Sequence, residues 1–371
     1  MIINNIRLSN FRNYEQLSLE LSPGINIFLG ENAQGKTNIL ESVYYSALSH
    51  SHRTNTDEDL IKKSTDKAVV ELTFERLGIE NKIMINLSRD KKRQIFYDDQ
   101  PIKVREMIGR LNVVLFSPED LFLIKGAPQG RRRFLDAEIS QANPRYFNDL
   151  TVYIRLLNQR NSLLKKIRET GSGRDTLYVW DEQLSKLAAE VVKKRLSSLQ
   201  ELNKIAAEMQ NKLSSEQENL EIYYEIKGRE CNEAVEENLN LWYNKRLKES
   251  VNNDIFRGST SIGPQRDDLI FSVNGNDLKS FGSQGQQRTG ILALKLSELE
   301  FLHQETGEYP VLLLDDVMSE LDSNRRCQLL EFIKKENIQT LITATEPAYF
   351  PTEFLENAYI VKEGHINAEN R

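Results

Sequence analysis

The sequence has little cysteine, no long apolar run and no excess of positive charge. Its 371 residues include two cysteines, Cys231 and Cys327, too few for a disulfide framework or a four-thiolate zinc site. The longest apolar runs, such as residues 113–116 and 311–314, are of strand length and far too short to cross a bilayer. The first residues also lack the apolar core of a secretion signal. We therefore expect a cytoplasmic protein without membrane contacts.

The formal net charge is −6 at pH 7. This excludes a protein coated in positive charge, but it leaves nucleic-acid binding open, because affinity for phosphates depends on local clusters. Basic clusters occur at residues 89–93, 103–110, 131–133 and 193–195. A cluster of this kind, taken alone, is most often a solvated surface.

Apolar periodicity predicts an α/β protein with a helical insertion. Residues 1–120 alternate in strand fashion around a helix at 36–48. Residues 143–215 have helical period in two arms, separated by a loop at 169–175, which predicts a helical hairpin. The remaining expected elements are strands at 220–226, 268–278, 311–314 and 340–344 and helices at 286–303 and 324–336. A chain of this length can hold one large domain or two to three smaller ones.

Residues 30–37 read Gly-Glu-Asn-Ala-Gln-Gly-Lys-Thr and fit the pattern G-x-x-x-x-G-K-[ST], between an apolar strand and a helix. In such a loop the glycines let backbone N–H groups turn inward around a phosphate, at the positive end of a helix. Lys36 would reach the β- and γ-phosphates and Thr37 would ligate Mg²⁺. The residues expected to bind the nucleotide are Gly30, Glu31, Asn32, Ala33, Gln34, Gly35, Lys36 and Thr37.

An acidic pair, Asp315 and Asp316, follows the apolar run 311–314. A phosphate-loop site needs a carboxylate at the end of a neighbouring buried strand. Asp315 is expected to hold Mg²⁺ through water, and Asp316 to polarise the attacking water as general base. Taken alone, an acidic pair after an apolar strand is also compatible with a simple turn that has no role in catalysis.

Two further segments resemble parts of the ATP-binding-cassette ATPases. Residues 283–287, Ser-Gln-Gly-Gln-Gln, are similar to that family's Ser-Gly-Gly-Gln signature, with Gln284 in place of the first glycine. The resemblance implies that Ser283, Gly285 and Gln286 cap the γ-phosphate of ATP bound by a second subunit. Residues 319–322 resemble the D-loop, which touches the opposite site. An ordinary polar helix cap is the alternative for the signature taken alone.

Two longer segments indicate which family within this group the chain resembles. The phosphate loop and the acidic strand are separated by the helical hairpin, as in SMC-type heads. Residues 118–136, beginning Pro-Glu-Asp-Leu, and residues 313–329, beginning Leu-Leu-Asp-Asp, resemble the two hallmarks of the RecF family of bacterial recombination mediators. Residues 263–268 and 51–54 agree with that family, and the similarity covers essentially the whole chain.

The resemblance implies an α/β fold of the ABC type. Lobe I, a mixed β-sheet with helices, would comprise residues 1–124 and 255–371. Lobe II, mainly helical and carrying the short hairpin, would be inserted as residues 125–254. The fold class thus follows from the family, and the hairpin from the periodicity of the residues themselves.

The resemblance also implies a role. ATP would close two heads into a homodimer that binds double-stranded DNA or the junctions at single-strand gaps. With RecR and RecO the dimer would help RecA to load, in repair, replication restart and SOS induction. Phosphate contacts carry no base specificity, which suits recognition of DNA structure. The candidate contacts are Lys91, Lys92, Arg93, Arg131, Arg132 and Arg133, and Arg53 is expected near the nucleotide or the DNA.

The resemblance implies an ATPase that is stimulated by DNA, and three departures from cassette ATPases predict that its activity is weak. Residues 117–119 replace a glutamine that contacts Mg²⁺ and water, and Thr343 or Thr345 replaces a switch histidine. The catalytic glutamate position holds Asp316, one methylene shorter. Each change moves a proton acceptor or phosphate sensor, and about 1.4 kcal/mol of barrier costs a tenfold loss of rate. Lys36, Asp316 and Ser283 are therefore expected to support slow turnover that resets a switch.

Three alternatives stay open. A structural DNA clamp would use ATP only to hold the dimer, with negligible hydrolysis. A compact SMC-like end processor would need a nuclease partner, and no nuclease motif is visible. The cytoplasmic ATPase of a transporter is disfavoured by the helical insertion and the basic clusters.

Overall fold

The computed structural model describes residues 1–214, 218–229 and 238–368, so Cys231 and residue 215, at the end of the expected second arm, lie outside the described residues. The chain divides into two compact units. Unit 1 comprises Met1–Leu121, Lys212–Glu216 and Arg288–Arg371, and unit 2 comprises Phe122–Asn211 and Gln217–Gln287. Residues 255–287, expected in lobe I, belong to unit 2 because β10 (Asp268–Val273) pairs along its length with β9 (Leu220–Glu225).

The first sheet of unit 1 is antiparallel, with strand order β2-β1-β4-β5-β6-β7. Its strands are β1 (Ile2–Phe11), β2 (Tyr14–Glu20), β4 (Lys67–Arg76), β5 (Ile79–Ser88), β6 (Gln94–Tyr97) and β7 (Gln100–Ile102). Buried residues alternate with more exposed ones along β4 and β5. This alternation is the pattern that predicted strands in the first 120 residues.

The second sheet of unit 1 has the order β15-β14-β3-β13-β12-β8 and is parallel apart from β15. Its strands are β3 (Ile25–Leu29), β8 (Val113–Phe116), β12 (Val311–Asp315), β13 (Thr340–Ala344), β14 (Ala358–Lys362) and β15 (His365–Ala368). Every residue of β3, β12 and β13 is buried, as expected for central parallel strands. The carboxyl ends of β3, β12 and β8 meet at one edge of the sheet, which places the site.

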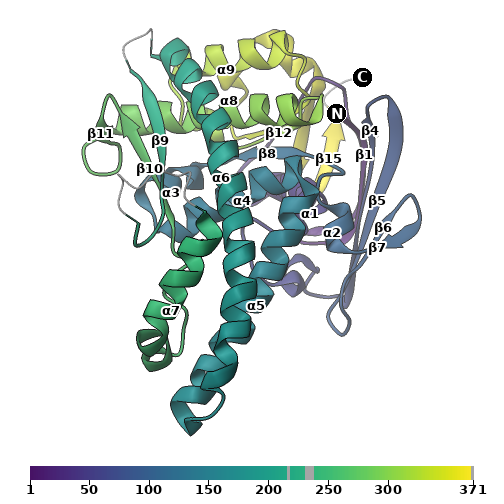
Figure 1. Cartoon of the computed structure of the whole chain (residues 1–371). Coiled ribbons are helices and arrows are strands. Elements are labelled where there is room, and N and C mark those ends of the chain that lie inside the picture. The colour runs from purple at the N-terminus through teal and green to yellow at the C-terminus, as the bar shows by residue number, and fades with distance from the viewer. Residues whose placement is uncertain (215–217, 230–237, 369–371) are drawn as a thin grey trace. The chain divides into compact units, whose positions relative to one another are not determined.

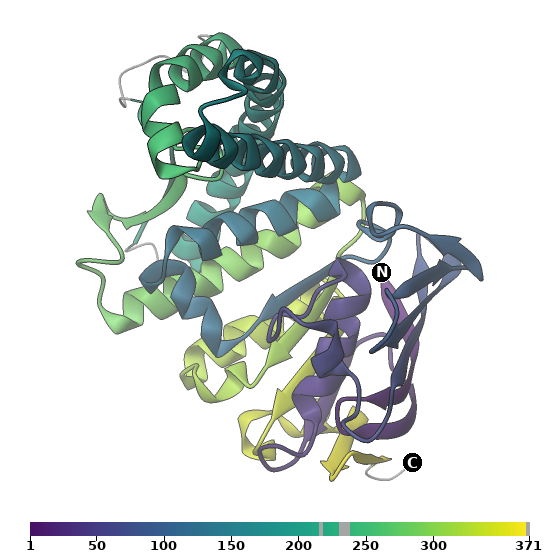
Figure 2. The ribbon, with the colours of Figure 1, turned by 90° about the horizontal axis from the view of Figure 1, so that it is seen from below.

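Helix α1 (Lys36–Leu48) packs between the two sheets of unit 1, against β4 and β5 on one side and β8, β12 and β13 on the other, as can be followed in Figure 2. The other helices of unit 1 include α2 (Val104–Met107) and α9 (Ser323–Lys335), with short 3₁₀ turns η1 (Asp57–Leu60), η2 (Pro118–Asp120), η4 (Val317–Ser319), η5 (Pro347–Tyr349) and η6 (Thr352–Asn357). Helix α8 (Gln284–Thr306) begins in unit 2 and continues through unit 1. The expected helices at 36–48, 286–303 and 324–336 are thus confirmed.

Unit 2 is mainly helical, and its two long helices, α5 and α6, follow one another along the chain and are labelled in Figure 1. Its elements are α3 (Leu121–Lys125, which starts at the boundary), α4 (Pro128–Ala142), α5 (Pro144–Thr170), η3 (Arg174–Thr176), α6 (Leu177–Leu213), α7 (Leu239–Arg257), β9, β10 and β11 (Asn276–Asp277). The loop between α5 and α6 lies where the sequence predicted it, and the apolar stripe of α6 is largely buried. The helical hairpin is therefore confirmed, while α7 was not foreseen.

A buried ionic cluster joins three helices of unit 2. Arg160 of α5 is fully buried and pairs with Asp181 of α6 at 2.7 Å and Asp254 of α7 at 2.8 Å. It also donates a hydrogen bond to the Thr260 hydroxyl. Removing one partner of such a cluster leaves an uncompensated buried charge, so the cluster fixes the packing of α7 on the hairpin.

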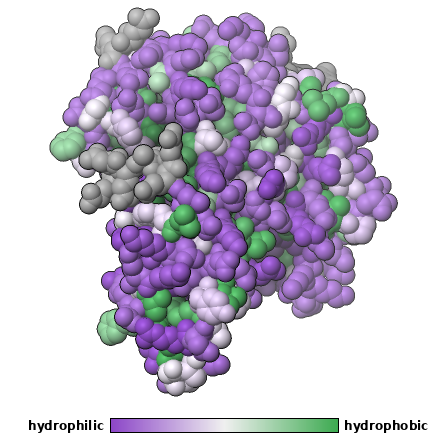
Figure 3. All heavy atoms as spheres, in the orientation of Figure 1, coloured by the Kyte–Doolittle hydropathy of each residue, from purple (hydrophilic) through white to green (hydrophobic). Residues whose placement is uncertain are grey.

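On the face shown in Figure 3, hydrophilic residues cover most of the described surface, and hydrophobic residues occur in small groups. Among the described residues no helix is both long and apolar enough to span a membrane.

Candidate nucleotide site

The phosphate loop connects β3 to α1, where the sequence placed it. Gly30 has φ 157°, and a Cβ there would lie 2.3 Å from the carbonyl oxygen of Val361. Gly35 has φ 114°, and a Cβ there would lie 2.5 Å from the Asn13 side-chain amide. Both positions therefore need glycine for conformation and for space. The Asn13 amide also donates to the Gln34 carbonyl at 3.0 Å, which ties the loop to the β1–β2 turn.

Lys36, the first residue of α1, is buried and folds its side chain back over the loop. Its ammonium donates to the carbonyl oxygens of Gly30 at 2.6 Å and Glu31 at 2.8 Å. Burial lowers the pKa of Lys36, whereas the charges of Asp316 and Asp315 raise it. The lysine thus lies within the field of the acidic pair, and nucleotide phosphates would offer it stronger partners than carbonyl groups.

Thr37 and Asp315 meet at the carboxyl edge of the parallel sheet. The Thr37 hydroxyl donates to the Asp315 carboxylate at 2.8 Å, and the Thr343 hydroxyl donates to the same oxygen at 2.8 Å. Thr343 lies opposite Asp315 in the register of β12 and β13. The structure therefore brings together the two predicted Mg²⁺ ligands, which lie 278 positions apart in the sequence.

This oxygen set fits Mg²⁺. Magnesium prefers hard oxygen ligands and is usually held by one or two protein groups together with substrate phosphates and water. Among the residues that the structure describes, no group of three or more His, Cys, Asp or Glu side chains could hold a metal ion. A hydroxyl and one carboxylate in contact thus suit an ion that arrives with a nucleotide, and they do not suit an all-protein metal site.

Asp316 follows β12 with φ 57°, in the left-handed region. Its backbone N–H donates to the Thr343 hydroxyl at 2.9 Å, so Thr343 holds both acidic residues in place. Burial raises the pKa of Asp316, as do the charges of Asp315 and Glu320, and Lys36 opposes the rise. Thr343 is thus occupied by the acidic pair, whereas Thr345 is half-buried just beyond β13.

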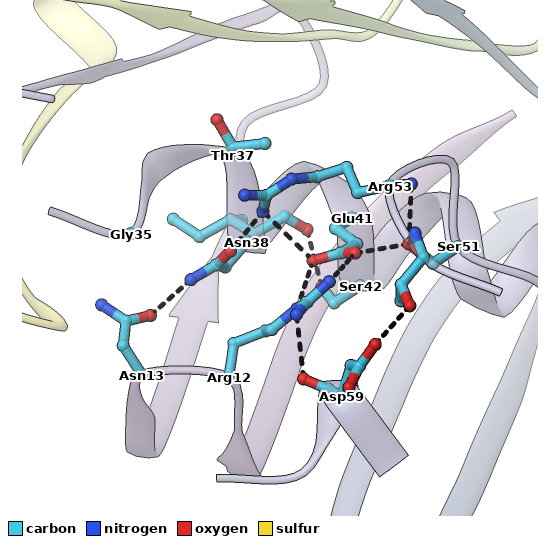
Figure 4. Close-up of polar contacts among 12 residues, drawn as sticks. Arg12, Asn13, Gly35, Thr37, Asn38, Glu41, Ser42, Ser51, Arg53 and Asp59 are labelled. Carbon is cyan, nitrogen blue, oxygen red and sulfur yellow. Dashed lines mark hydrogen bonds and ion pairs between the residues drawn. The ribbon is translucent and has the colours of Figure 1, made fainter. Parts of the chain in front are cut away.

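A clamp around Glu41 was not predicted from the sequence. Glu41 of α1 is fully buried, one turn after Thr37, and accepts two hydrogen bonds from Arg12 at 2.8 and 2.6 Å. It also accepts a bond from the Ser51 hydroxyl, as Figure 4 shows. Arg12 and Ser51 lower the pKa of Glu41 against the effect of burial. The clamp fastens the segment after α1 to the helix that carries the phosphate loop.

Arg53 lies at the first turns of α1. Its guanidinium donates to the Asn38 side chain at 2.9 Å, and Asn38 donates to Asn13 at 2.7 Å (Figure 4). The Arg53 side chain is 45% exposed. The structure places Arg53 beside the phosphate-loop helix, with part of its side chain exposed to solvent, and its contact with the nucleotide or the DNA stays a prediction.

The signature segment forms the N-terminal end of α8, a 23-residue helix. Ser283 N–H donates to the Gln286 side chain at 2.9 Å, and Gln286 N–H donates to the Ser283 hydroxyl at 3.2 Å, a reciprocal cap. Ser283, Gln284 and Gly285 are exposed. The helix end is therefore capped and open to solvent, and the predicted role of Ser283, Gly285 and Gln286 opposite a second subunit remains a prediction.

The D-loop is tethered to the next turn of α8 within unit 1. Glu320 pairs with Arg288 at 2.8 Å. Arg325, at the start of α9, donates to the Thr289 hydroxyl at 2.6 Å. The first turns of α8 in unit 1 and the segment after Asp316 are thus fastened together, so displacement of one is expected to move the other.

The predicted DNA contacts divide by exposure. In unit 1, Lys91 and Lys92 are exposed. Arg93 instead donates to the Ser49 carbonyl at 2.7 Å and pairs with Asp57 at 3.1 Å. Its cation is thus engaged inside the protein, which leaves the two lysines as the stronger candidates of this cluster.

In unit 2 the structure removes Arg131 from the predicted set. Arg131 is 5% exposed and makes a two-pronged pair with Asp268 at 2.7 and 2.8 Å. Arg132 is half-buried and donates to the Asp267 carbonyl at 2.6 Å. Arg133 is exposed and stays a candidate. The sequence showed three adjacent cations, but helix α4 turns them to different sides.

Comparison with known proteins gives a consistent family assignment. The family described as RecF/RecN/SMC N terminal domain matches residues 2–365. A DNA replication and repair protein RecF of Clostridium botulinum (strain ATCC 19397 / Type A) is 46% identical over 370 residues, covering 99% of both chains. The protein of that name from Lachnoclostridium phytofermentans is 43% identical over 363 residues, covering 98% of both chains.

Solved structures support the same family assignment. A RecF–ATP structure, described as a recombination mediator in the RecFOR pathway, is 36% identical and superposes with a TM-score of 0.92, covering 100% of this chain and 98% of that one. The Smc head domain of Pyrococcus furiosus superposes with a TM-score of 0.55 at 16% identity, covering 99% and 95% of the two chains. The second similarity shows the fold alone, that of an SMC-like ATPase head.

Proposed function

The chain belongs to the RecF family of DNA replication and repair proteins, within the RecF/RecN/SMC group, and on this premise we propose that it is an ATP-switched, DNA-binding protein of recombinational repair. ATP closes two copies into a dimer that clamps DNA at single-strand gaps or junctions. With RecR and RecO the dimer promotes RecA loading, replication restart and SOS induction in the cytoplasm. Slow hydrolysis then opens the dimer.

This proposal rests on the exposure of the first three residues of the signature segment, residues 283–287. The phosphate loop, Thr37 and Asp315 grip a triphosphate from one side. Ser283 lies at the exposed, capped N-terminal end of a long helix, where the helix dipole favours an anion. A signature placed in this way is available to the γ-phosphate held by another copy. ATP occupancy would therefore govern pairing.

The chemistry follows from the positions of the side chains. Lys36 exchanges its bonds to the loop carbonyl groups for the β- and γ-phosphates and neutralises charge there. Asp316 lies within the field of Lys36 and accepts a proton from the attacking water. Mg²⁺, held by Thr37 and Asp315, supplies charge stabilisation to the phosphate oxygens when it is bound. Asp316 has one methylene less than glutamate, which makes turnover slow.

Measuring the size of the protein in solution tests this proposal. We expect a monomer without nucleotide and with ADP, and a dimer with a slowly hydrolysed ATP analogue and Mg²⁺. Duplex DNA with a single-strand gap should shift the equilibrium further towards the dimer. A protein that stays monomeric with the analogue and DNA, although it binds the analogue, would refute ATP-driven pairing.

The exposed lysines of the first cluster are proposed to contact DNA phosphates. We expect Lys91→Glu with Lys92→Glu to weaken duplex binding by about tenfold at moderate salt and to lower the slope of log K against log salt by about 1.8, since each phosphate contact contributes about 0.9. Fluorescence anisotropy over a salt series measures both quantities. A control with Lys186→Glu and Lys204→Glu on α6 carries the same charge change, and equal losses in both doubles would rule out a specific contact.

The second candidate function is a structural DNA clamp that uses ATP only to hold the dimer and hydrolyses it negligibly. It is favoured by Asp316 in place of a glutamate and by Glu119 in the segment where cassette ATPases carry glutamine. The observation that separates the two functions is ATP turnover with DNA present. A dimer that forms with ATP and never reopens would support the clamp.

A further inference from the structure

Unit 2 contains an open groove, here named the α5 groove, that has no part in the function proposed above. Its volume is about 610 Å³, within the range of about 300–1,000 Å³ that is usual for ligand sites. One face of α5 forms most of the groove, and Trp180, half-buried near the start of α6, completes it. The polar residues that α5 contributes are Thr151, Arg155, Asn158, Gln159 and Ser162, and all of them are exposed. Their spacing by three and four residues places them on the same side of the helix.

Several polar groups of the α5 groove are not used by the fold. The side chains of Arg155, Asn158 and Gln159 make no hydrogen bond or ion pair with any described residue, and the indole N–H of Trp180 has no partner in the described part of the chain either. Exposed lysines of α6 differ, because three of them pair with a glutamate of their own helix. These pairs are Lys186–Glu182, Lys193–Glu190 and Lys204–Glu201. The groove therefore presents hydrogen-bonding groups that remain available to a ligand.

The charge of the α5 groove favours an anionic ligand. None of the described residues that line it is acidic, although the chain as a whole carries a net charge of −6. Arg155 supplies one cation, and Lys166, exposed four residues after Ser162, supplies a second on the same face of α5. Phosphates bind local cations of this kind whatever the net charge of the protein.

The other side chains of the groove indicate which polyanion fits. A protein helix docks through an apolar stripe, but of the described lining residues only Ile154 and Trp180 are apolar. Proteins that bind single-stranded nucleic acid combine cations along the backbone with aromatic rings on which bases stack. In a duplex the base faces are covered by neighbouring bases, so a free indole face suits a single strand. The amides of Asn158 and Gln159 can bond the edges of unpaired bases.

We propose that the α5 groove binds single-stranded DNA, with one base stacked on Trp180 and phosphates at Arg155 and Lys166. This inference rests on the proposed function and deepens it, because it assigns the single strand of a gap to unit 2, apart from the duplex contacts proposed for Lys91 and Lys92 in unit 1. The groove lies entirely within unit 2 of one chain. Binding of a single strand should therefore need neither ATP nor a second copy.

The first test is fluorescence of Trp180 itself. The chain has two tryptophans, so Trp242→Phe leaves Trp180 as the only one. We expect oligo-dT, added without nucleotide, to quench the fluorescence of this variant, because a stacked base quenches an indole ring. Anisotropy of labelled oligo-dT measures binding in the same titration. Binding without quenching would exclude Trp180 as the stacking ring, and absence of binding, as expected if the groove holds a protein helix instead, would overturn the proposal.

The second test separates stacking from charge. We expect Trp180→Leu to weaken oligo-dT binding by about tenfold, within the range for loss of one stacked base, and Trp180→Phe to recover part of the loss. Arg155→Gln with Lys166→Gln, both at exposed positions, should lower the slope of log K against log salt by about 1.4, since each phosphate contact of a single strand contributes about 0.7.

Lys193→Gln with Lys204→Gln is the matched control, because it removes two exposed cations from α6. We expect this double variant to bind oligo-dT within about twofold of the original protein, the margin allowed here for a change of net charge alone. Equal losses in the two double variants would show a general effect of charge and overturn the proposal.

The last test distinguishes this inference from the proposed function. With a slowly hydrolysed ATP analogue and Mg²⁺, the original protein should bind gapped duplex more tightly than nicked duplex, and Arg155→Gln with Lys166→Gln should lose this preference while its dimer still forms. A preference that survives in the variant overturns the inference and leaves ATP-driven pairing intact. A protein that binds oligo-dT through Trp180 but never pairs with the analogue refutes the proposed function and supports the single-strand site.

Discussion

Asp316→Asn is expected to lower ATP turnover by about 10²- to 10⁴-fold, the contribution of a general base, while ATP binding persists. Asparagine has nearly the same shape as aspartate but cannot accept a proton from water. Thr37 and Asp315 keep their positions, because Asp315 is held by the Thr343 hydroxyl. Lys36 keeps its position because its ammonium bonds the carbonyl oxygens of Gly30 and Glu31. The dimer formed with ATP should therefore persist for much longer than that of the original protein. Single-turnover kinetics and sizing of the ATP-bound protein measure the two effects.

The dependence of ATP turnover on pH is a second test of Asp316 as the general base. A general base must be ionised, so turnover is present above its pKa and is lost as the pH falls through it. Because burial and Asp315 raise the pKa of Asp316, the acid limb should lie at higher pH than the value of about 3.9 for an ordinary aspartate. Asp99→Asn, on an exposed hairpin turn, is the control. Turnover in Asp316→Asn that matches this control would exclude Asp316 as the base.

The edge of the sheet that carries the candidate site was predictable because its sequence signals are local. The glycine spacing of residues 30–37 and the apolar runs before Gly30 and Asp315 depend on backbone geometry and on burial of parallel strands, which short sequence windows reveal. The boundary between the two units was harder to predict from the sequence. Residues 268–273 look like a strand in any context, and only their pairing with β9 assigns them to unit 2.

Partners distant in sequence explain the remaining differences. Arg131 belongs to a run of three cations, and the pattern gave no sign of Asp268, which buries and neutralises it. Thr343 or Thr345 was expected to replace a histidine, and the register of Thr343 opposite Asp315 makes it a hydrogen-bond partner of the acidic pair. Glu41 lies in a helix whose residue spacing gave no sign of its buried partner Arg12. In each case the decisive contact joins elements that only the folded chain brings together.

Ser283→Arg is expected to abolish both ATP-dependent pairing and turnover, with ATP binding by the monomer retained. Ser283 is exposed at the end of α8, so arginine can be accommodated in the monomer at the cost of a helix cap, about 1 kcal/mol. In a composite site the same side chain would project into the γ-phosphate pocket of the other copy. Ser280→Arg, three residues earlier and also exposed, adds equal bulk and charge and should leave pairing intact.

Mixing two inactive variants then tests whether the site is shared. Lys36→Ala should lose its own phosphate site but keep a sound signature, and Ser283→Arg should lose its signature but keep a sound phosphate loop. One of the two sites in a mixed dimer would combine the sound halves, so turnover should reappear on mixing, at a fraction of the original rate. A mixture that stays as inactive as its components, although mixed dimers form, would mean that each triphosphate is hydrolysed by one chain alone. Because the two changes fall on opposite halves of one site, recovery cannot arise from either variant by itself.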